Sequence, residues 1–186
     1  MTTQIPDGRR QVSLSSFSHL FCQMVSHALT MASETSEVEN MLCEIGYDVG
    51  ARTLELVALR DHSGIKFPTR QAALQFVQHA VWRSLFAKSA ERLEPNSSNS
   101  EEWFLTDLSP LTNRYVHVPE EYGELNCAAF QAGIIKGALC EAGAKCEVLA
   151  HTVRPQSSQQ TAGASESYTV FAITFVDSEE AALFGC

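Results

Sequence analysis

The stretch that most constrains this chain is LNCAAFQAGIIKGALCEAGAKC, from Leu125 to Cys146. Its strongly polar residues follow one another at intervals of five: Asn126, Gln131, Lys136 and Glu141. At about 100° per residue, that interval spreads them around the whole circumference of a helix. A helix without one polar face is buried on several sides. The stretch therefore predicts a central core helix, capped by Asn126 and ended near Gly143.

Two glycines one turn apart, Gly133 and Gly137, lie inside this predicted helix. Each glycine costs about 0.8–1.0 kcal/mol of helix propensity relative to alanine. That cost predicts the close approach of another backbone. The neighbour is a strand or a helix of the same domain, or a partner subunit, and the sequence leaves these alternatives open.

Hydrophobic periodicity places three helices before this stretch. The first follows the apolar stripe from Leu14 to Ala28, with Ser13 or Ser15 as its N-cap. The second runs to Arg60 and is expected to break or bend at a glycine, Gly46 or Gly50. The third is expected from Pro68 to about residue 93, followed by a solvated loop.

Alternating residues predict four strands, at 103–108, 115–118, 145–153 and 167–176. The element order is ααα-ββ-α-ββ in a single α+β domain. We expect a flexible N-terminus at 1–12, a domain at 13–180 with a mobile insert at 154–167, and a tail at 181–186. Apolar residues on both faces of the last strand indicate that both sides are covered.

Composition argues against several classes of partner. The net charge is -9 and no Lys/Arg run occurs, which disfavours nucleic acid and anionic membrane. No signal peptide or membrane span is expected. The six cysteines show no paired spacing, so we expect reduced thiols in a cytosolic protein.

The sequence offers little catalytic chemistry. A nucleophile-base pair is conceivable between Cys127 or Cys140 and His117 or His151, but cysteines in apolar runs are expected to be inert because burial raises the thiol pKa. The common phosphate-binding and hydrolase motifs are absent from the sequence. We therefore expect neither catalytic residues nor a cofactor.

Metal binding is equally unexpected. His19 and His27 share a helical face but are two turns apart, about 12 Å, which is too far to hold one ion. We therefore expect no metal.

Three stretches together resemble a small subunit of the transport protein particle, TRAPP, a vesicle-tethering complex. They are VSLSSFSHLFCQMV from Val12, IGYDVGARTLELVALRD from Ile45, and the stretch from Leu125 extended to His151. VWRSLFAKSAERLE and PLTNRYVHVPEE indicate, within that family, the branch numbered five in the animal complex. The resemblance implies a helical layer packed on a twisted antiparallel sheet.

The family motifs GYxxGxR and NCAAF-AGI fall on positions that we expect to define the fold first and an interface second. They are Gly46, Tyr47, Gly50, Arg52, Asn126, Cys127, Ala128, Ala129, Phe130, Ala132, Gly133 and Ile134.

The resemblance implies a non-catalytic scaffold. Other small TRAPP subunits would be its partners, and the assembly would act as the nucleotide exchange factor of a Rab-family GTPase in ER-to-Golgi transport. The chain would be cytoplasmic and reach Golgi and ER membranes only through the complex. The alternative is a module of the same fold that binds a lipid or another hydrophobic small molecule. A sister subunit carries an acylated cysteine after its GYxxGxR helix, whereas RDHSGIKF here has none, so acylation at that place is not expected.

Candidate anchors for a partner lie on the first two predicted helices: Phe17, Phe21, Met24 and Val38. Paired helices offer a broad apolar patch. The alternative is that these side chains pack only on the chain's own core.

Overall fold

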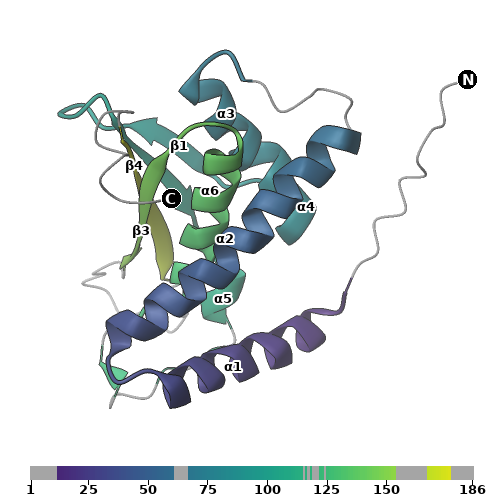
Figure 1. The fold of residues 1–186 in the computed structure, drawn as a ribbon, viewed down its shortest axis with the longest axis vertical. Coiled ribbons are helices and arrows are strands. Elements are labelled where there is room, and N and C mark those ends of the chain that lie inside the picture. The colour runs from purple at the N-terminus through teal and green to yellow at the C-terminus, as the bar shows by residue number, and fades with distance from the viewer. Residues whose placement is uncertain are drawn as a thin grey trace, which may run out of the picture.

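A computed structural model describes residues 12–60, 67–114, 116, 118, 122–123, 125–153 and 167–176, and of Arg114 the backbone alone. The predicted N-terminal segment, most of the insert at 154–167 and the tail at 181–186 lie outside these residues. In the described part, helices cover one face of an antiparallel sheet of four strands, as the sequence predicts (Figure 1).

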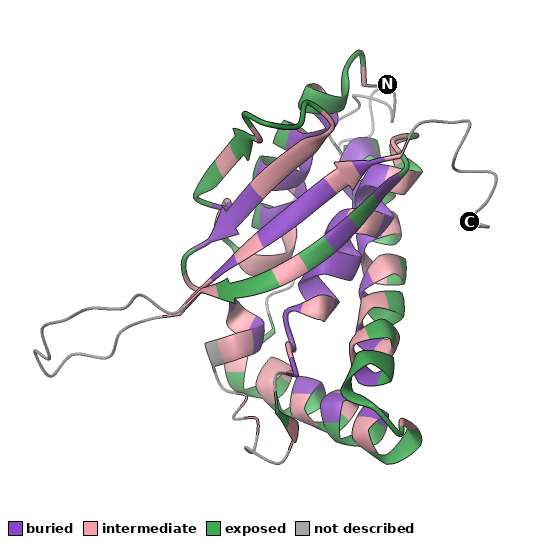
Figure 2. Cartoon of the chain, turned by 90° about the vertical axis from the view of Figure 1, so that its left-hand side faces the viewer, coloured by how far each residue is buried: buried purple, intermediate pink, exposed green. Residues whose placement is uncertain are grey.

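Helix α1 lies across the lower end of the molecule, and helix α2 rises from the end of α1 along one side (Figures 1 and 2). Helix α1, Leu14–Met31, begins at Ser13, whose side chain accepts a hydrogen bond from the amide of Ser16, confirming one of the two predicted caps. Helix α2, Thr35–Arg60, is continuous through Gly46 and Gly50, so the predicted break is wrong. The two glycines instead allow α2 to pack closely against the backbone of α6.

The third predicted helix is shorter than expected and has a π-helical segment in its middle. It consists of α3 (Arg70–Phe76), η1 (Val77–Val81) and α4 (Trp82–Phe86). It ends where Ala87 takes a left-handed conformation, with φ of 58°. The residues that we expected to extend the helix and to form a loop instead form strand β1, Arg92–Pro95.

The sheet has the strand order β1-β2-β4-β3, and all its pairs are antiparallel. Strands β2 (Glu102–Asp107), β3 (Cys146–Val153) and β4 (Tyr168–Phe175) confirm three predicted strands. The strand predicted at 115–118 is not formed by those of its residues that the structure describes. Helix α5, Leu111–Arg114, precedes it, Val116 and Val118 are in irregular backbone, and Tyr115 and His117 lie outside the described residues.

Helix α6, Ala129–Glu141, is the predicted central helix and lies between α2 and the sheet (Figure 1). Its polar residues have different surroundings, and the buried Nε2 of Gln131 has no hydrogen-bond partner among the described residues. Gln131 is fully buried, and its Oε1 accepts a hydrogen bond from Thr112 Oγ1 at 2.9 Å. Lys136 forms an ion pair with Glu147 of β3 at 2.9 Å, and Glu141 is exposed. The helix ends at a left-handed Gly143, near the predicted place.

The other face of the sheet bears no helix among the described residues (Figure 2). Phe171 and Ile173 of β4 point into the core and are fully buried. Val170 and Thr174, on the opposite face, are half-buried. The expected cover on both sides of this strand is thus found on one side of the described structure.

Candidate interaction surfaces

Helices α2 and α6 meet at four glycines, two from each helix. A Cβ atom added to Gly133 would lie 2.8 Å from the carbonyl carbon of Cys43, and one on Gly137 would lie 2.7 Å from that of Tyr47. Gly46 and Gly50 face the backbone of α6 just as closely, at Phe130 and Ile134. Ordinary side chains would keep helix axes about 8–10 Å apart. The close approach predicted for Gly133 and Gly137 is therefore confirmed, and the neighbour is a helix of the same domain.

The other family-motif positions surround this contact. Cys127, Ala128, Phe130, Ala132 and Ile134 are buried. Tyr47, Asn126 and Ala129 are half-buried, whereas Arg52 is exposed on the outside of α2. This placement supports a role in the fold for the buried positions and leaves Arg52 available to a partner.

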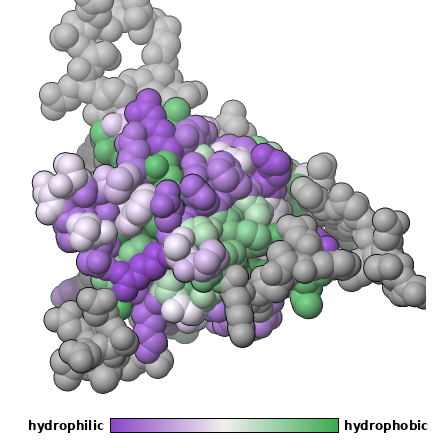
Figure 3. Space-filling model, turned by 90° about the horizontal axis from the view of Figure 1, so that it is seen from above, coloured by the Kyte–Doolittle hydropathy of each residue, from purple (hydrophilic) through white to green (hydrophobic). Residues whose placement is uncertain are grey.

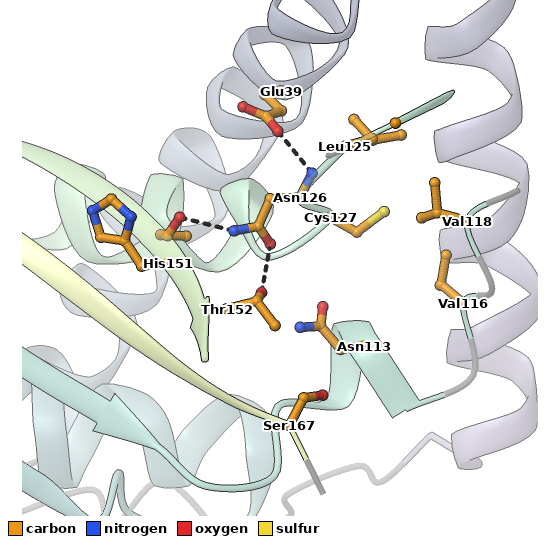
Figure 4. A pocket seen from close by; sticks show the side chains of 12 residues that line it. Glu39, Asn113, Val116, Val118, Leu125, Asn126, Cys127, His151, Thr152 and Ser167 are labelled. Atoms are coloured by element: carbon orange, nitrogen blue, oxygen red, sulfur yellow. Dashed lines mark hydrogen bonds between the residues drawn. The ribbon is translucent and has the colours of Figure 1, made fainter. Parts of the chain in front are cut away.

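Asn126 connects three parts of the fold (Figure 4). Its amide N–H donates to Glu39 Oε1 of α2 at 2.7 Å, and its side-chain nitrogen donates to the carbonyl of Ala150 in β3 at 2.8 Å. Its Oδ1 accepts from the amide of Ala128 at 3.1 Å and from Thr152 Oγ1 at 3.3 Å. The N-cap of α6 is Ala128, which makes no side-chain cap bond, so the predicted cap at Asn126 is wrong. Asn126 instead fastens the edge strand β3 to the turn that precedes α6.

A hollow of about 810 Å³ lies beside Asn126 (Figure 4). Val116, Val118, Leu125 and Cys127 form one apolar wall. The rest of its lining is largely polar: Glu39, Asn113, Asn126, His151, Thr152 and Ser167. Its volume is that of a small-molecule site, but a lipid chain is favoured by predominantly apolar walls. The lining gives little support to the lipid-binding alternative.

Cys127 and His151 both line this hollow, yet they do not form the conceivable nucleophile-base pair. His151 and Cys127 lie on opposite sides of Asn126, and the Cys127 sulfur points toward Val118 (Figure 4). Burial, with a smaller contribution from the charge of Glu39, raises the pKa of the Cys127 thiol to about 11. Cys127 is therefore the inert packing residue that the sequence predicts.

The cysteines do not all behave in this way. Burial also raises the pKa of Cys43, whereas the pKa of Cys140 is lowered by a hydrogen bond from the Cys146 thiol, which outweighs the opposing effect of burial. The positive charge of Lys136 and a hydrogen bond from Tyr47 act in the same direction. The expectation that burial raises the thiol pKa therefore does not hold for Cys140.

The predicted anchors on α1 and α2 divide into two groups. Phe21 and Val38 are only 1% and 2% exposed, so both belong to the chain's own core and are wrong as surface anchors. Phe17 and Met24 are half-buried at the edge of that core. Phe17 stacks on Phe21, with ring centroids 5.8 Å apart.

The more exposed apolar side chains of α1 are Leu20 at 62% and Met31 at 67%. Eleven residues apart, they lie within about 20° of each other around the helix, and Met24 lies on the same stripe. This exposed stripe lies beside the buried face of α1 and does not coincide with it. Sequence periodicity identified the stripe but could not tell its buried centre from its exposed margin.

Helix α2 continues this apolar exposure on its outer side with Ile45, Leu56 and Leu59, which are 40%, 45% and 69% exposed. Side chains this exposed and this apolar are individually common on proteins. These three side chains lie within about 60° of one another around α2, at about 100° per residue. Aligned apolar side chains of this kind mark interaction surfaces.

A second apolar region lies across the uncovered face of the sheet. Phe104 of β2 and Leu149 of β3 flank Ala172 of β4, each directly opposite it in the strand register. Leu149 is 64% exposed. The end of the molecule seen from above is mostly hydrophilic, with one hydrophobic patch near its middle (Figure 3). Apolar surface is therefore gathered in places and is not spread evenly.

The acidic residues near β2, for which no acid-base role is expected, have structural partners. Asp107 is fully buried, accepts hydrogen bonds from Trp82 Nε1 at 3.2 Å and from the amide of Ser109 at 3.0 Å, and pairs with Lys88. Glu101 pairs with Arg70, and Glu102 accepts a hydrogen bond from Asn96.

The described residues include no helix with the length and apolar character that a membrane span needs. They also contain no group of three or more His, Cys, Asp or Glu side chains placed to hold a metal ion.

Comparison with known proteins relates the chain to one family. Residues 17–176 match the family described as transport protein particle (TRAPP) component. The chain is 35% identical over 146 residues to trafficking protein particle complex subunit 5 of Dictyostelium discoideum, with 78% of each chain covered. It is 36% identical over 143 residues to the Homo sapiens protein of that name, covering 77% of this chain and 76% of the human one.

Structural comparison agrees on the fold. A crystal structure of trafficking protein particle complex subunit 3 from Naegleria fowleri, covalently bound to palmitic acid, matches with a TM-score of 0.63 at 13% identity. The match covers 88% of this chain and 95% of that one. Residues 61–66, where the sequence lacks the sister subunit's cysteine, lie outside the described residues. The chain belongs to the transport protein particle (TRAPP) component family, and within it is similar to the proteins named subunit 5.

Proposed function

We propose that this chain is a scaffold subunit of the TRAPP vesicle-tethering complex and binds other small subunits of that complex through α1 and the outer side of α2. The observation that carries the proposal is the exposed apolar stripe of α1, with Leu20 and Met31 more than half exposed. The chain has already buried the face of α1 that its own core requires, through Phe21, Val25 and Ala28. The remaining apolar margin is therefore available to a partner.

The proposed role extends to the whole assembly. As a complex, it acts as nucleotide exchange factor for a Rab-family GTPase in ER-to-Golgi transport, and this chain contacts that GTPase only indirectly. The chain is cytoplasmic and lies at the periphery of Golgi and ER membranes through its partners. Its relatives are named as subunits of a trafficking particle complex, which supports this assignment.

A non-catalytic role fits the chemistry of the described residues. The proposed nucleophile-base pair of Cys127 and His151 is not assembled, and the buried carboxylate of Asp107 is occupied by structural hydrogen bonds. The molecule also exposes large apolar side chains on α1, α2 and the sheet. The proposal therefore assigns binding to surfaces and no reaction to this chain.

The test is a double substitution on the stripe, Leu20→Glu with Met31→Glu, in the tagged full-length protein expressed in its native cells. Glutamate is a good helix former and both sites are exposed, so the free energy of unfolding should change by no more than about 0.5 kcal/mol per site. Two charges in the centre of an apolar interface should abolish co-purification of the partner on this side. Quantitative mass spectrometry of the co-purified chains measures the loss.

Leu149→Glu is the matched control, because Leu149 is exposed to the same extent but lies on the uncovered face of the sheet. It should retain the partners that the α1 double variant loses. If the α1 variant melts like the wild-type protein and still recovers every partner, α1 is not the interface. If both variants lose the same partners, the loss does not report a contact of α1.

A further inference from the structure

An exposed arginine lies within the apolar stripe on the outer side of α2. The exposed side chains of Ile45, Leu56 and Leu59 span about 60° around this helix, and exposed Arg52 falls inside that arc. With Ile45 at 0°, Leu59 lies at about 320°, Arg52 at about 340° and Leu56 at about 20°. A positive charge therefore interrupts the apolar stripe near its middle.

Arg52 makes no ion pair and no side-chain hydrogen bond with any other described residue. Carboxylates are nonetheless close to it along the helix. Asp48 is four residues before it and Glu55 three residues after it, and residues at these spacings are neighbours on a helix surface. Because neither of them pairs with Arg52, its N–H donors are left to solvent or to an acceptor from another molecule.

An interface that covers the stripe would remove Arg52 from water. Burying a charge without a partner is costly, so apolar side chains alone are a poor match for this surface. A carboxylate is the acceptor whose geometry fits best, because guanidinium and carboxylate form two parallel hydrogen bonds. A partner that covers Leu56 and Leu59 should therefore also bring an acid to Arg52.

A row of acids beside the stripe restricts where that partner carboxylate can lie. Glu44, Asp48 and Glu55 are exposed and lie within about 40° of one another around α2. A partner acid placed against this row would face like charges, which disfavours the contact. The surface of α2 therefore accepts a carboxylate at Arg52 and opposes one along the acidic row.

We propose that Arg52 determines which partner binds the outer side of α2. The partner is a neighbouring protein subunit whose apolar contact surface presents one aspartate or glutamate to the Arg52 guanidinium. This inference rests on the proposed function, because it takes the outer side of α2 as an interface. Leu20 and Met31 supply apolar area to that interface, whereas Arg52 supplies its specificity.

The first step of the test identifies the surface that lies against the stripe. The photoreactive residue p-benzoylphenylalanine replaces Leu56, one turn from Arg52, in the tagged full-length chain in its native cells. Ultraviolet light cross-links it to the contacting chain, and mass spectrometry of the digest identifies the linked peptide. We expect a segment of another small subunit that carries an aspartate or glutamate among apolar residues.

Substitutions of Arg52 then separate its charge from its area. Arg52→Met keeps a long side chain and good helix propensity but removes the charge, and Arg52→Glu reverses the charge. Recovery of the cross-linked subunit should fall at least about tenfold with methionine, because the partner's carboxylate is left buried and unpaired, and further with glutamate. Changing that partner carboxylate to arginine should restore recovery with Arg52→Glu.

Two matched variants should retain the cross-linked subunit. Arg92→Met removes a positive charge from an exposed arginine of β1, on the sheet. Asp48→Asn removes the carboxylate nearest to Arg52 on its own helix. All these sites are exposed, so every variant should unfold within about 0.5 kcal/mol of the wild type.

Several results would overturn the proposal. Full recovery with Arg52→Met would show that Arg52 stays in water. Loss of the subunit with Asp48→Asn would show that Arg52 takes its carboxylate from its own helix. A linked segment without any acid, or failure of the charge exchange to restore binding, would also contradict it. In each case the proposed function stands if the double variant at Leu20 and Met31 still loses its partner.

Discussion

At the scale of single residues, the four glycines between α2 and α6 set the distance between the two helices. Gly46 and Gly50 of α2 and Gly133 and Gly137 of α6 leave no room for a Cβ atom against the facing backbone. Helix propensity favours alanine at all four sites by about 1 kcal/mol. The contact requires glycine, so propensity and packing act in opposite directions here.

Gly46→Ala tests which effect dominates. Propensity alone predicts that the free energy of unfolding rises by about 1 kcal/mol. Because the added Cβ would lie 3.0 Å from the carbonyl carbon of Phe130, and closer still to its oxygen, we expect it to fall by about 3 kcal/mol or more. Urea unfolding measures the sign.

Ala51→Gly is the control for Gly46→Ala, because Ala51 is a half-buried residue of the same helix. It should lose about 1 kcal/mol, the propensity cost alone. A Gly46→Ala protein as stable as the wild type would show that the helices do not approach this closely.

Asn126, just before α6, is a second residue whose contacts the sequence does not predict. Asn126→Ala removes the bond to the amide of Ala128 and the bond to the Ala150 carbonyl, and should cost about 2 kcal/mol of unfolding free energy. Asn126→Ser keeps an oxygen for the Ala128 amide and should lose about half as much. Thermal melting of the three proteins gives the order, and equal melting of the alanine and serine variants would show that the bond to the Ala128 amide contributes nothing.

At the scale of elements, α6 was largely predictable from the sequence, and its surroundings were not. The even spread of polar residues predicts burial on several sides, and Gly133 with Gly137 predicts a close neighbour. The neighbour itself requires pairing Gly46 and Gly50 of α2 with residues more than eighty positions away. Local patterns carry no information on such a distant partner.

The region from Leu85 to Val118 shows where local patterns fail. The apolar period continued past Phe86, but the left-handed Ala87 ends the helix and lets Arg92–Pro95 join the sheet. Strand β1 is short, charged and exposed on its edge, so alternation is weak. Edge strands are often kept short and polar, which hides them from sequence analysis.

Local sequence patterns also could not identify which apolar residues of α1 are exposed. The stripe on α1 was predicted, but the choice of Phe21 over Leu20 as an anchor was wrong because only the packing of α1 on α2 and α6 decides which margin is buried. The ring centroids of Phe21 and of Phe130 in α6 are 5.4 Å apart, whereas the side chain of Leu20 is exposed to solvent. The lowered pKa of Cys140 comes first from Cys146, across the turn that ends α6, and to a smaller extent from Lys136.

At the scale of the whole molecule, apolar surface occurs on two sides. Helices α1 and α2 carry one of these surfaces, and the face of the sheet that is turned away from the helices carries the other (Figure 2). A scaffold that connects two neighbours needs two such surfaces. The substitutions on Leu20 with Met31 and on Leu149 examine them separately.

The central claim is that the chain works inside a complex of related small subunits. Its most direct measurement is affinity purification of the tagged wild-type chain from its native cells, with the mass of the intact assembly and the identity of its chains read by mass spectrometry. The account predicts a hetero-oligomer that contains other small TRAPP subunits. Recovery of the chain as a free monomer, with no TRAPP subunit bound, would contradict it.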